Sequence, residues 1–187
     1  MRFLKCKVEQ KWTAYAKRKY TGKKFNHMTI MESGRGQIVG TLGEIAFRKY
    51  LYKKGIKYNY VADQKLPYDF VVNDIKIDVK TKLCTSNPKS TYSCHVNTSQ
   101  KNYDADLYVF ARTDKQNVWL LGYIHKSDFW NPLNQDAKDV KEGDDDDGFV
   151  ERENSRKILI NNLIPMSHFD SEQKSIIDWL KRYNAYP

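Results

Sequence analysis

The chain of 187 residues carries 32 lysines and arginines against 23 acidic residues, a net charge of +9 that makes a polyanion such as nucleic acid the expected partner. Its hydrophobic fraction of 40% supports one domain with a single core, whereas no run of about 18 apolar residues supports a membrane-spanning helix, and the polar first residues do not form a secretory signal. Three cysteines are too few for a disulfide framework, so we expect a soluble cytoplasmic protein with reduced thiols.

Residues 1–36 are expected to form a basic N-terminal arm that contacts phosphates. Lysines and arginines crowd its first 24 residues, where Glu9 is the only acid. The stretch from Val8 to Tyr20 mixes aromatic and basic residues at a spacing typical of a short helix, in which we expect Trp12 to pack rather than to stack on bases. The residues expected to bind nucleic acid are Lys17, Arg18, Lys19, Lys23, Lys24 and Arg35, together with Lys82 farther along the chain.

Residues 37–187 are expected to form one further unit in which helices and strands alternate. The elements expected first are a helix from Gln37 to Lys54, a strand from Lys57 to Ala62, a hairpin of Phe70 to Val72 and Ile75 to Thr81 turned at Asn73-Asp74, a loop from Thr85 to Thr98 and a short helix from Thr98 to Tyr103. Those expected next are strands from Asp106 to Arg112 and Val118 to Ile124, a mobile acidic loop around Glu142 to Asp147, a strand from Lys157 to Ile164 and a terminal helix from Ser171 to Tyr183. This order predicts an α/β fold with a central mixed sheet flanked by helices, to which the last strand and helix form a C-terminal extension.

Two aspartates and a lysine of the candidate hairpin are placed to act together. Side chains alternate between the two faces of a strand, so Asp78 and Lys80 share one face, about 7 Å apart. Asp69, at the start of the partner strand, is expected to lie beside them. Mg²⁺ prefers hard oxygen ligands, which Asp69, Asp78 and the Val79 carbonyl would supply, while Lys80 would orient or deprotonate a water or stabilise negative charge. The pattern therefore predicts phosphodiester hydrolysis.

Pro67-Tyr68-Asp69 followed by Asp78-Val79-Lys80 resembles the signature of the PD-(D/E)xK nuclease superfamily. The resemblance spans roughly residues 40–111 and implies a restriction-endonuclease-like core, in which a helix leads into a mixed sheet that carries the motif on adjacent strands. It also implies a DNA nuclease that uses Mg²⁺, for which Mn²⁺ can substitute. A resolvase-like, homing or restriction-like endonuclease would fit a chain of this size, and a phage origin would suit it.

Two further site residues follow from the same resemblance. Gly40-Thr41-Leu42-Gly43-Glu44 resembles the helix of archaeal-type Holliday junction resolvases, which implies that Glu44 is a catalytic residue and a metal ligand. The two glycines, about one helical turn apart, would let this helix approach the sheet closely. The resemblance also implies that Gln100 contacts the site. Tyr103 matches less well, because it stands three positions after Gln100 rather than four.

Several interpretations besides a DNA endonuclease stay open. The fold could serve a catalytically silent DNA-binding or assembly protein, and the same site could serve an exonuclease or an RNA nuclease. Asp78 and Lys80 could also form an ordinary ion pair on a strand surface. Zinc at Cys84, Cys94 and His95 is not supported, because no CxxC pair occurs, and no Walker-type loop suggests a nucleotide cofactor. A homodimer and a nicking monomer are both compatible with such a nuclease.

Overall fold

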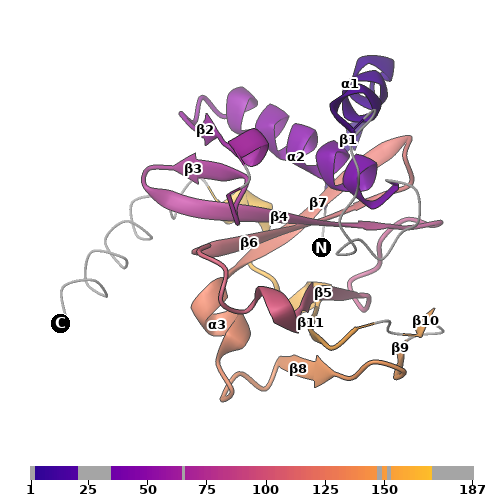
Figure 1. Ribbon diagram of the computed structural model, residues 1–187, viewed down its shortest axis with the longest axis vertical. Helices are drawn as coiled ribbons and strands as arrows, with labels where there is room; N and C mark the ends of the chain where they lie inside the picture. Colours follow the sequence, from indigo (N-terminus) through magenta and orange to yellow (C-terminus); the bar gives the residue numbers. More distant parts are fainter. Residues whose placement is uncertain (1–2, 21–34, 65, 147–148, 151–152, 170–187) are drawn as a thin grey trace.

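The computed structural model describes residues 3–20, 35–64, 66–146, 149–150 and 153–169, and these form a mixed α/β structure (Figure 1). A curled sheet of six strands lies at its centre, in the order β1-β7-β6-β4-β3-β2. Its strands are β1 (Leu4–Lys7), β2 (Asn59–Tyr60), β3 (Phe70–Val72), β4 (Ile75–Leu83), β6 (Leu107–Thr113) and β7 (Asn117–His125). The sheet is mixed because β4 and β6 run parallel, whereas the other neighbours are antiparallel.

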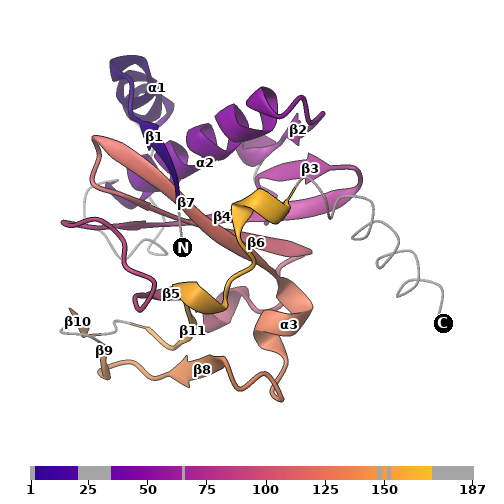
Figure 2. The same cartoon turned by 180° about the vertical axis from the view of Figure 1, so that it is seen from behind.

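Different elements cover the two faces of the central sheet, as the front and back views show (Figures 1 and 2). Helices α1 (Gln10–Tyr20) and α2 (Arg35–Lys53) lie over one face. The other face carries α3 (Lys126–Trp130) and a second sheet in the order β5-β11-β8. The strands of this second sheet are β5 (Ser93–Asn97), β8 (Ala137–Val140) and β11 (Ser155–Leu159), and the short strands β9 (Asp145–Asp146) and β10 (Phe149–Val150) pair separately.

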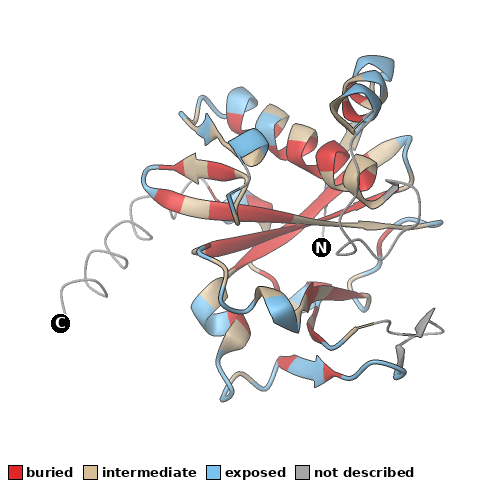
Figure 3. Cartoon of the chain, viewed as in Figure 1, coloured by how far each residue is buried: buried red, intermediate tan, exposed pale blue. Residues whose placement is uncertain are grey.

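The hydrophobic core is split by the central sheet into two clusters. Under α2, residues such as Leu42 and Phe47 pack against Ile77 and Val79 of β4, and Phe169, just after η5 (Met166–His168), packs edge to face on Phe47. The second cluster, which includes Phe129 of α3, lies between the central sheet and the second sheet. Figure 3 shows buried residues concentrated along the sheet and the facing side of α2. The face of β4 that carries Ile75, Ile77 and Val79 is therefore covered by α2.

Several expected elements are confirmed. The expected helix from Gln37 corresponds to α2, and the expected strands before and after Asp114 correspond to β6 and β7. The hairpin is confirmed with its turn, because Asn73 and Asp74 have φ of 50° and 67°, the left-handed pair that a two-residue turn requires. Trp12 is 5% exposed and packs in the core as expected.

Other expectations were wrong, and tertiary pairing explains most of them. The expected loop from Thr85 to Thr98 contains β5, whose polar residues have little strand propensity but pair along the whole of β11. The expected short helix after it is one turn of 3-10 helix, η3 (Thr98–Gln100). The expected acidic loop contains β9, which pairs with β10.

The boundaries of two expected strands also differ, and several short elements were not expected. The strand expected from Lys57 is reduced to β2 and followed by η2 (Ala62–Gln64), and the strand expected from Lys157 ends with β11 and continues into η4 (Ile160–Asn162). β1, α3 and β8 are too short for periodicity to identify. The expected terminal helix from Ser171 lies outside the described residues.

Residues 4–20 of the expected arm are folded onto the domain. β1 pairs antiparallel with β7, and α1 packs on α2 through Trp12 and Ala16, which are buried. The Lys49 ammonium of α2 lies 5.1 Å from the Trp12 ring centre and 2.9 Å from the Glu9 carboxylate. The packed face of α1 therefore includes Trp12 and Ala16 together with Lys19, whereas Lys11, Lys17 and Arg18 are exposed.

Gly43 is the point where α2 meets β4. A Cβ at this position would lie 1.9 Å from the Thr81 hydroxyl oxygen, so Gly43→Ala forces the helix and the strand apart. We expect it to lower the free energy of unfolding by about 1–3 kcal/mol, measured by urea unfolding. Gly40→Ala is the matched control, because its Cβ would meet no neighbour closer than 3.9 Å. Equal stability of the two variants would contradict close contact at Gly43, and Thr81→Ala should partly rescue Gly43→Ala.

Candidate active site at the start of the β3–β4 hairpin

β4 presents its polar residues on the face away from α2. Ile77 and Val79 enter the core beneath α2, so Asp78 and Lys80 point to the opposite side. Asp78 is 7% exposed, and its carboxylate forms an ion pair with the Lys80 ammonium at 2.5 Å. The Lys80 ammonium also donates to the Gln100 side-chain oxygen at 2.6 Å, from η3. The structure thus brings the predicted residues Asp78, Lys80 and Gln100 together.

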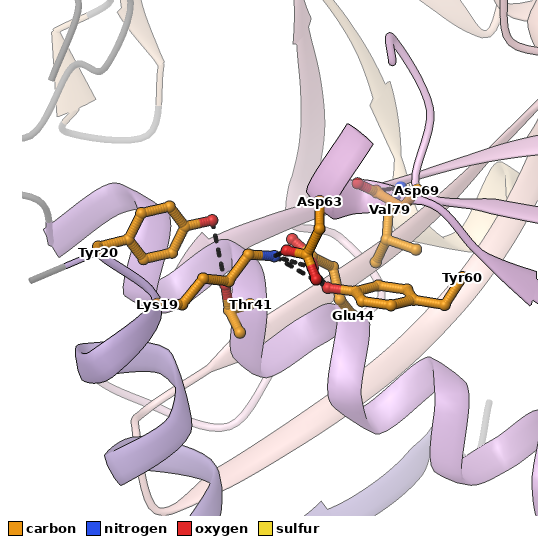
Figure 4. Close-up of polar contacts among 8 residues, drawn as sticks. All are labelled: Lys19, Tyr20, Thr41, Glu44, Tyr60, Asp63, Asp69 and Val79. Carbon is orange, nitrogen blue, oxygen red and sulfur yellow. Dashed lines mark hydrogen bonds and ion pairs between the residues drawn. The ribbon is translucent and has the colours of Figure 1, made fainter. Parts of the chain in front are cut away.

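Asp69 lies where the pairing of β3 with β4 ends. Phe70 is paired with Ile77, so continuing the register by one residue places Asp69 opposite Asp78. The Asp69 carboxylate accepts a hydrogen bond from the Val79 main-chain N–H at 2.8 Å. Because the N–H and C=O of one strand residue leave on the same edge, the Val79 carbonyl lies on the edge that Asp69 occupies. The two predicted metal donors Asp69 and Val79 therefore lie next to each other (Figure 4).

Glu44 reaches the same region from α2, on the other side of β4, and is 8% exposed. The Tyr60 hydroxyl donates to its carboxylate at 2.5 Å, and the Lys19 ammonium lies 3.6 Å from the same oxygen. Lys19 also contacts the Tyr60 hydroxyl at 3.0 Å and the Asp63 carboxylate at 2.9 Å (Figure 4). The side chain of Lys19 is only 9% exposed, so α1 contributes a buried counter-charge to Glu44.

The charges of Asp78 and Glu44 act on the Asp69 carboxylate. Burial raises the pKa of Asp69 well above its usual range, and the negative charges of Asp78 and then Glu44 raise it further. Burial also raises the pKa of Tyr60, with the Glu44 charge adding to it, so this hydroxyl stays protonated and donates to Glu44. For Lys19 burial lowers the pKa, but the charge of Glu44 and the hydrogen bonds to Tyr60 and Asp63 together outweigh burial, so the pKa is raised. The region therefore concentrates negative charge around a few fixed cations.

A divalent cation fits these donors in kind. Carboxylate and carbonyl oxygens are the ligands that Mg²⁺ prefers. Burial first, and then the charges of Asp78 and Glu44, raise the pKa of Asp69, and a bound cation would favour its charged form. Across the described residues, however, no three His, Cys, Asp or Glu side chains stand as a ready group of metal ligands. Glu44 is engaged with Lys19 and Tyr60, and Asp78 with Lys80. Closing the ligands around an ion would thus require these side chains to exchange partners.

The remaining predicted residues are Tyr103 and the lysines and arginines expected to bind nucleic acid. Tyr103 is held through its carbonyl, which accepts a hydrogen bond from the Lys126 ammonium. Lys17 and Arg18 are exposed on α1, and Lys82 is half-buried on β4. Lys23 and Lys24, and the side chain of Arg35, lie outside the described part of the chain. Binding of nucleic acid by these residues stays a prediction, whereas Lys19 takes part in the carboxylate region.

Tyr60 and Asp63 were not expected in the site. They stand in a short strand and a single 3-10 turn, and neither belongs to a motif. The sequence offers one indication, because Tyr60 follows the alternation of the strand expected there, but its partner Lys19 is 41 residues away along the chain. Contacts of this separation are set by how α1 packs on α2.

No family model, no curated protein and no solved structure matches the chain. The functional conclusion therefore rests on the geometry of the site. None of the helices in the described ranges is long and apolar enough to cross a lipid bilayer.

Asp69→Asn tests the electrostatic strain by its pH dependence. Folding raises the pKa of Asp69. The contribution of this side chain to the free energy of unfolding is therefore fully present below the unfolded-state pKa, and it is lost as pH rises through the folded-state pKa. Asn can still accept the Val79 hydrogen bond but carries no charge. We expect Asp69→Asn to unfold at a higher urea concentration than the wild type at pH 8 and to lose this advantage at pH 4. A variant that is less stable at pH 8 would contradict the repulsion.

Lys19→Met tests the buried counter-charge. Removing the ammonium leaves the Glu44 and Asp63 carboxylates without it, while the methionine keeps most of the packing volume. We expect a loss of about 1–3 kcal/mol in the free energy of unfolding. Lys11→Met is the control on the same helix, because Lys11 pairs with Glu9 at the surface and such pairs contribute about 0–1 kcal/mol. Equal losses would mean that Lys19 acts as a surface lysine.

Proposed function

We propose that this protein is a Mg²⁺-dependent DNA nuclease with a restriction-endonuclease-like core. The observation that carries the proposal is the arrangement at the start of the hairpin, where Asp69 lies against the Val79 main chain at the edge of β4 and opposite Asp78, which is paired with Lys80. A hairpin that enters a mixed sheet beneath α2 is also the architecture that the resemblance implies. The site, rather than the fold, is the basis of the functional proposal, since one fold supports many activities.

The chain's own residues provide the remaining requirements of phosphodiester hydrolysis. When bound, Mg²⁺ would supply Lewis-acid polarisation of the phosphate and a more acidic water. Asp69, Asp78, Glu44 and the Val79 carbonyl would hold it. The Lys80 ammonium, fixed between Asp78 and Gln100, is placed to hold a water or a phosphate oxygen, and Gln100 orients this lysine. The net charge of +9 supports a polyanionic substrate.

Buried acids that lie close to one another are costly for a protein that only binds DNA. Asp78 and Glu44 are both nearly inaccessible, and the charges of both disfavour ionisation of Asp69. A binding surface for phosphate needs cations on the outside rather than carboxylates held together inside. This arrangement favours catalysis over the silent DNA-binding module.

Cleavage assays test the proposal directly. Supercoiled, linear and branched DNA and RNA are incubated with the protein in Mg²⁺, Mn²⁺ or EDTA. We expect DNA cleavage with either metal and none with EDTA. Asp78→Asn and Lys80→Met should each reduce the rate by about 100-fold or more, because each removes a group that acts on the reacting phosphate.

Lys76→Met is the matched control for Lys80→Met. Lys76 stands on the same face of β4, but its ammonium pairs with Asp104 at 2.7 Å instead of Asp78. The Lys76→Met variant should retain most of the cleavage activity. Binding of DNA without cleavage under every metal condition would favour the silent module, whereas cleavage confined to RNA or to DNA ends would favour an RNA nuclease or an exonuclease. Cleavage that is unchanged in Asp78→Asn would place the activity elsewhere.

A further inference from the structure

A pocket of about 410 Å³ opens between η3, α3 and the second sheet. Its volume lies in the range that holds small ligands. Its walls combine an aromatic ring with cationic and neutral polar side chains and one acid, Asp139, whose carboxylate is paired with Arg156. The residues that give the walls this character are Thr98, Lys101, Trp130, Lys141, Asn154 and Arg156. None of them takes part in the carboxylate site.

The pocket walls match the parts of a nucleotide. Trp130 is partly exposed, and an indole ring is a platform on which any base can stack. The Lys101 ammonium lies 5.9 Å from the Trp130 ring centre, and Lys141 is exposed at the same opening, so both can meet a phosphate. Thr98 and Asn154 add hydrogen-bonding groups for a base edge or a sugar.

The buried Arg156 keeps this pocket formed. Its guanidinium donates to the Phe129 carbonyl at 2.6 Å, to the Asn131 carbonyl at 2.9 Å and to the Asp139 carboxylate at 2.8 Å. These bonds join β11 to the end of α3 and to β8. Because Arg156 is occupied in this way, the cations that can face a ligand are the two lysines.

The pocket adjoins the candidate active site through two connections. Thr98 and Lys101 stand on either side of Gln100, whose side chain accepts a hydrogen bond from Lys80. On the other wall, the Trp130 indole N–H donates to the Tyr108 hydroxyl at 3.0 Å, and the Lys80 ammonium lies 5.8 Å from the Tyr108 ring centre. One side chain, Gln100 or Tyr108, therefore connects Lys80 with each of these two walls of the pocket.

We propose that the pocket receives an unpaired nucleotide of the DNA strand next to the phosphate that is cleaved. The base stacks on Trp130, and Lys101 and Lys141 contact the flanking phosphates. This inference rests on the proposed nuclease function and specifies its substrate. A base within a continuous duplex is paired and stacked and cannot enter a pocket. The preferred substrates are therefore single strands, flaps and branched DNA rather than uninterrupted duplex.

Binding measurements in EDTA, where cleavage is suppressed, test the pocket separately from catalysis. Fluorescence anisotropy compares a single strand, a flap and an uninterrupted duplex of equal length. We expect the single strand and the flap to bind about tenfold more tightly than the duplex, as the stacking of one base supports. Abasic substitution, moved one position at a time along the unpaired segment, should weaken binding sharply at one position.

Variants of the pocket link this preference to its residues. Trp130→Leu should remove most of the preference, and Trp130→Phe, which keeps an aromatic face, should retain it. Lys101→Ala combined with Lys141→Ala should weaken binding without a loss of folding, because both side chains are exposed. Lys53→Ala combined with Lys57→Ala, also exposed, is the control of equal charge and should bind more tightly than the pocket pair.

Three outcomes would overturn the proposal that the pocket receives an unpaired nucleotide of DNA. One is equal binding of duplex and unpaired DNA with no sensitive abasic position, and another is a preference that Trp130→Leu leaves intact. The third is tight binding of a free deoxynucleoside monophosphate without competition between it and the DNA strand. The pocket would then hold a free nucleotide and not a nucleotide of DNA. In each case metal-dependent cleavage by the wild type would leave the nuclease proposal standing. If no cleavage is found but the pocket's preference for unpaired DNA persists, the nuclease proposal fails and the pocket proposal stands.

Discussion

The hydrogen bond from the Val79 main chain to the Asp69 carboxylate holds the candidate site together. It fixes an acid at the place where pairing between β3 and β4 ends, so that Asp69 faces Asp78 across the hairpin. Burial and the charges of Asp78 and Glu44 raise the pKa of Asp69, which means that the fold maintains this arrangement against repulsion. Strain of this kind is typical of functional sites, where stability is exchanged for chemistry.

Two lysine side chains balance the negative charge of the acids in the site. Lys80 balances the charge of Asp78 and is held by Gln100, whereas Lys19 balances Glu44 and Asp63 on the other side of β4. Lys19 comes from α1, which makes the N-terminal helix part of the site. The second sheet contributes on the other side, because β5 and β11 support η3 and with it Gln100.

Sequence patterns predicted the part of the site that is formed by residues close together in the chain. The alternation of β4 and the left-handed turn at Asn73 and Asp74 follow from neighbouring residues, and they sufficed to bring Asp78 and Lys80 together. Tyr60 could not be predicted in the same way, since its contact with Lys19 depends on packing between distant elements. β5 was missed for a similar reason: its polar residues form a strand because β11 pairs with them.

The nuclease proposal depends above all on Glu44, Asp69 and Asp78 sharing one divalent cation. The most direct measurement is the anomalous scattering of Mn²⁺ in crystals of the wild-type protein. We expect one strong peak within ligand distance, about 2.0–2.3 Å, of oxygens from Asp69, Asp78 and the Val79 carbonyl, with Glu44 reaching the ion directly or through a water. A peak bound without Asp69 and Asp78, or no peak near the hairpin at saturating Mn²⁺, would contradict it.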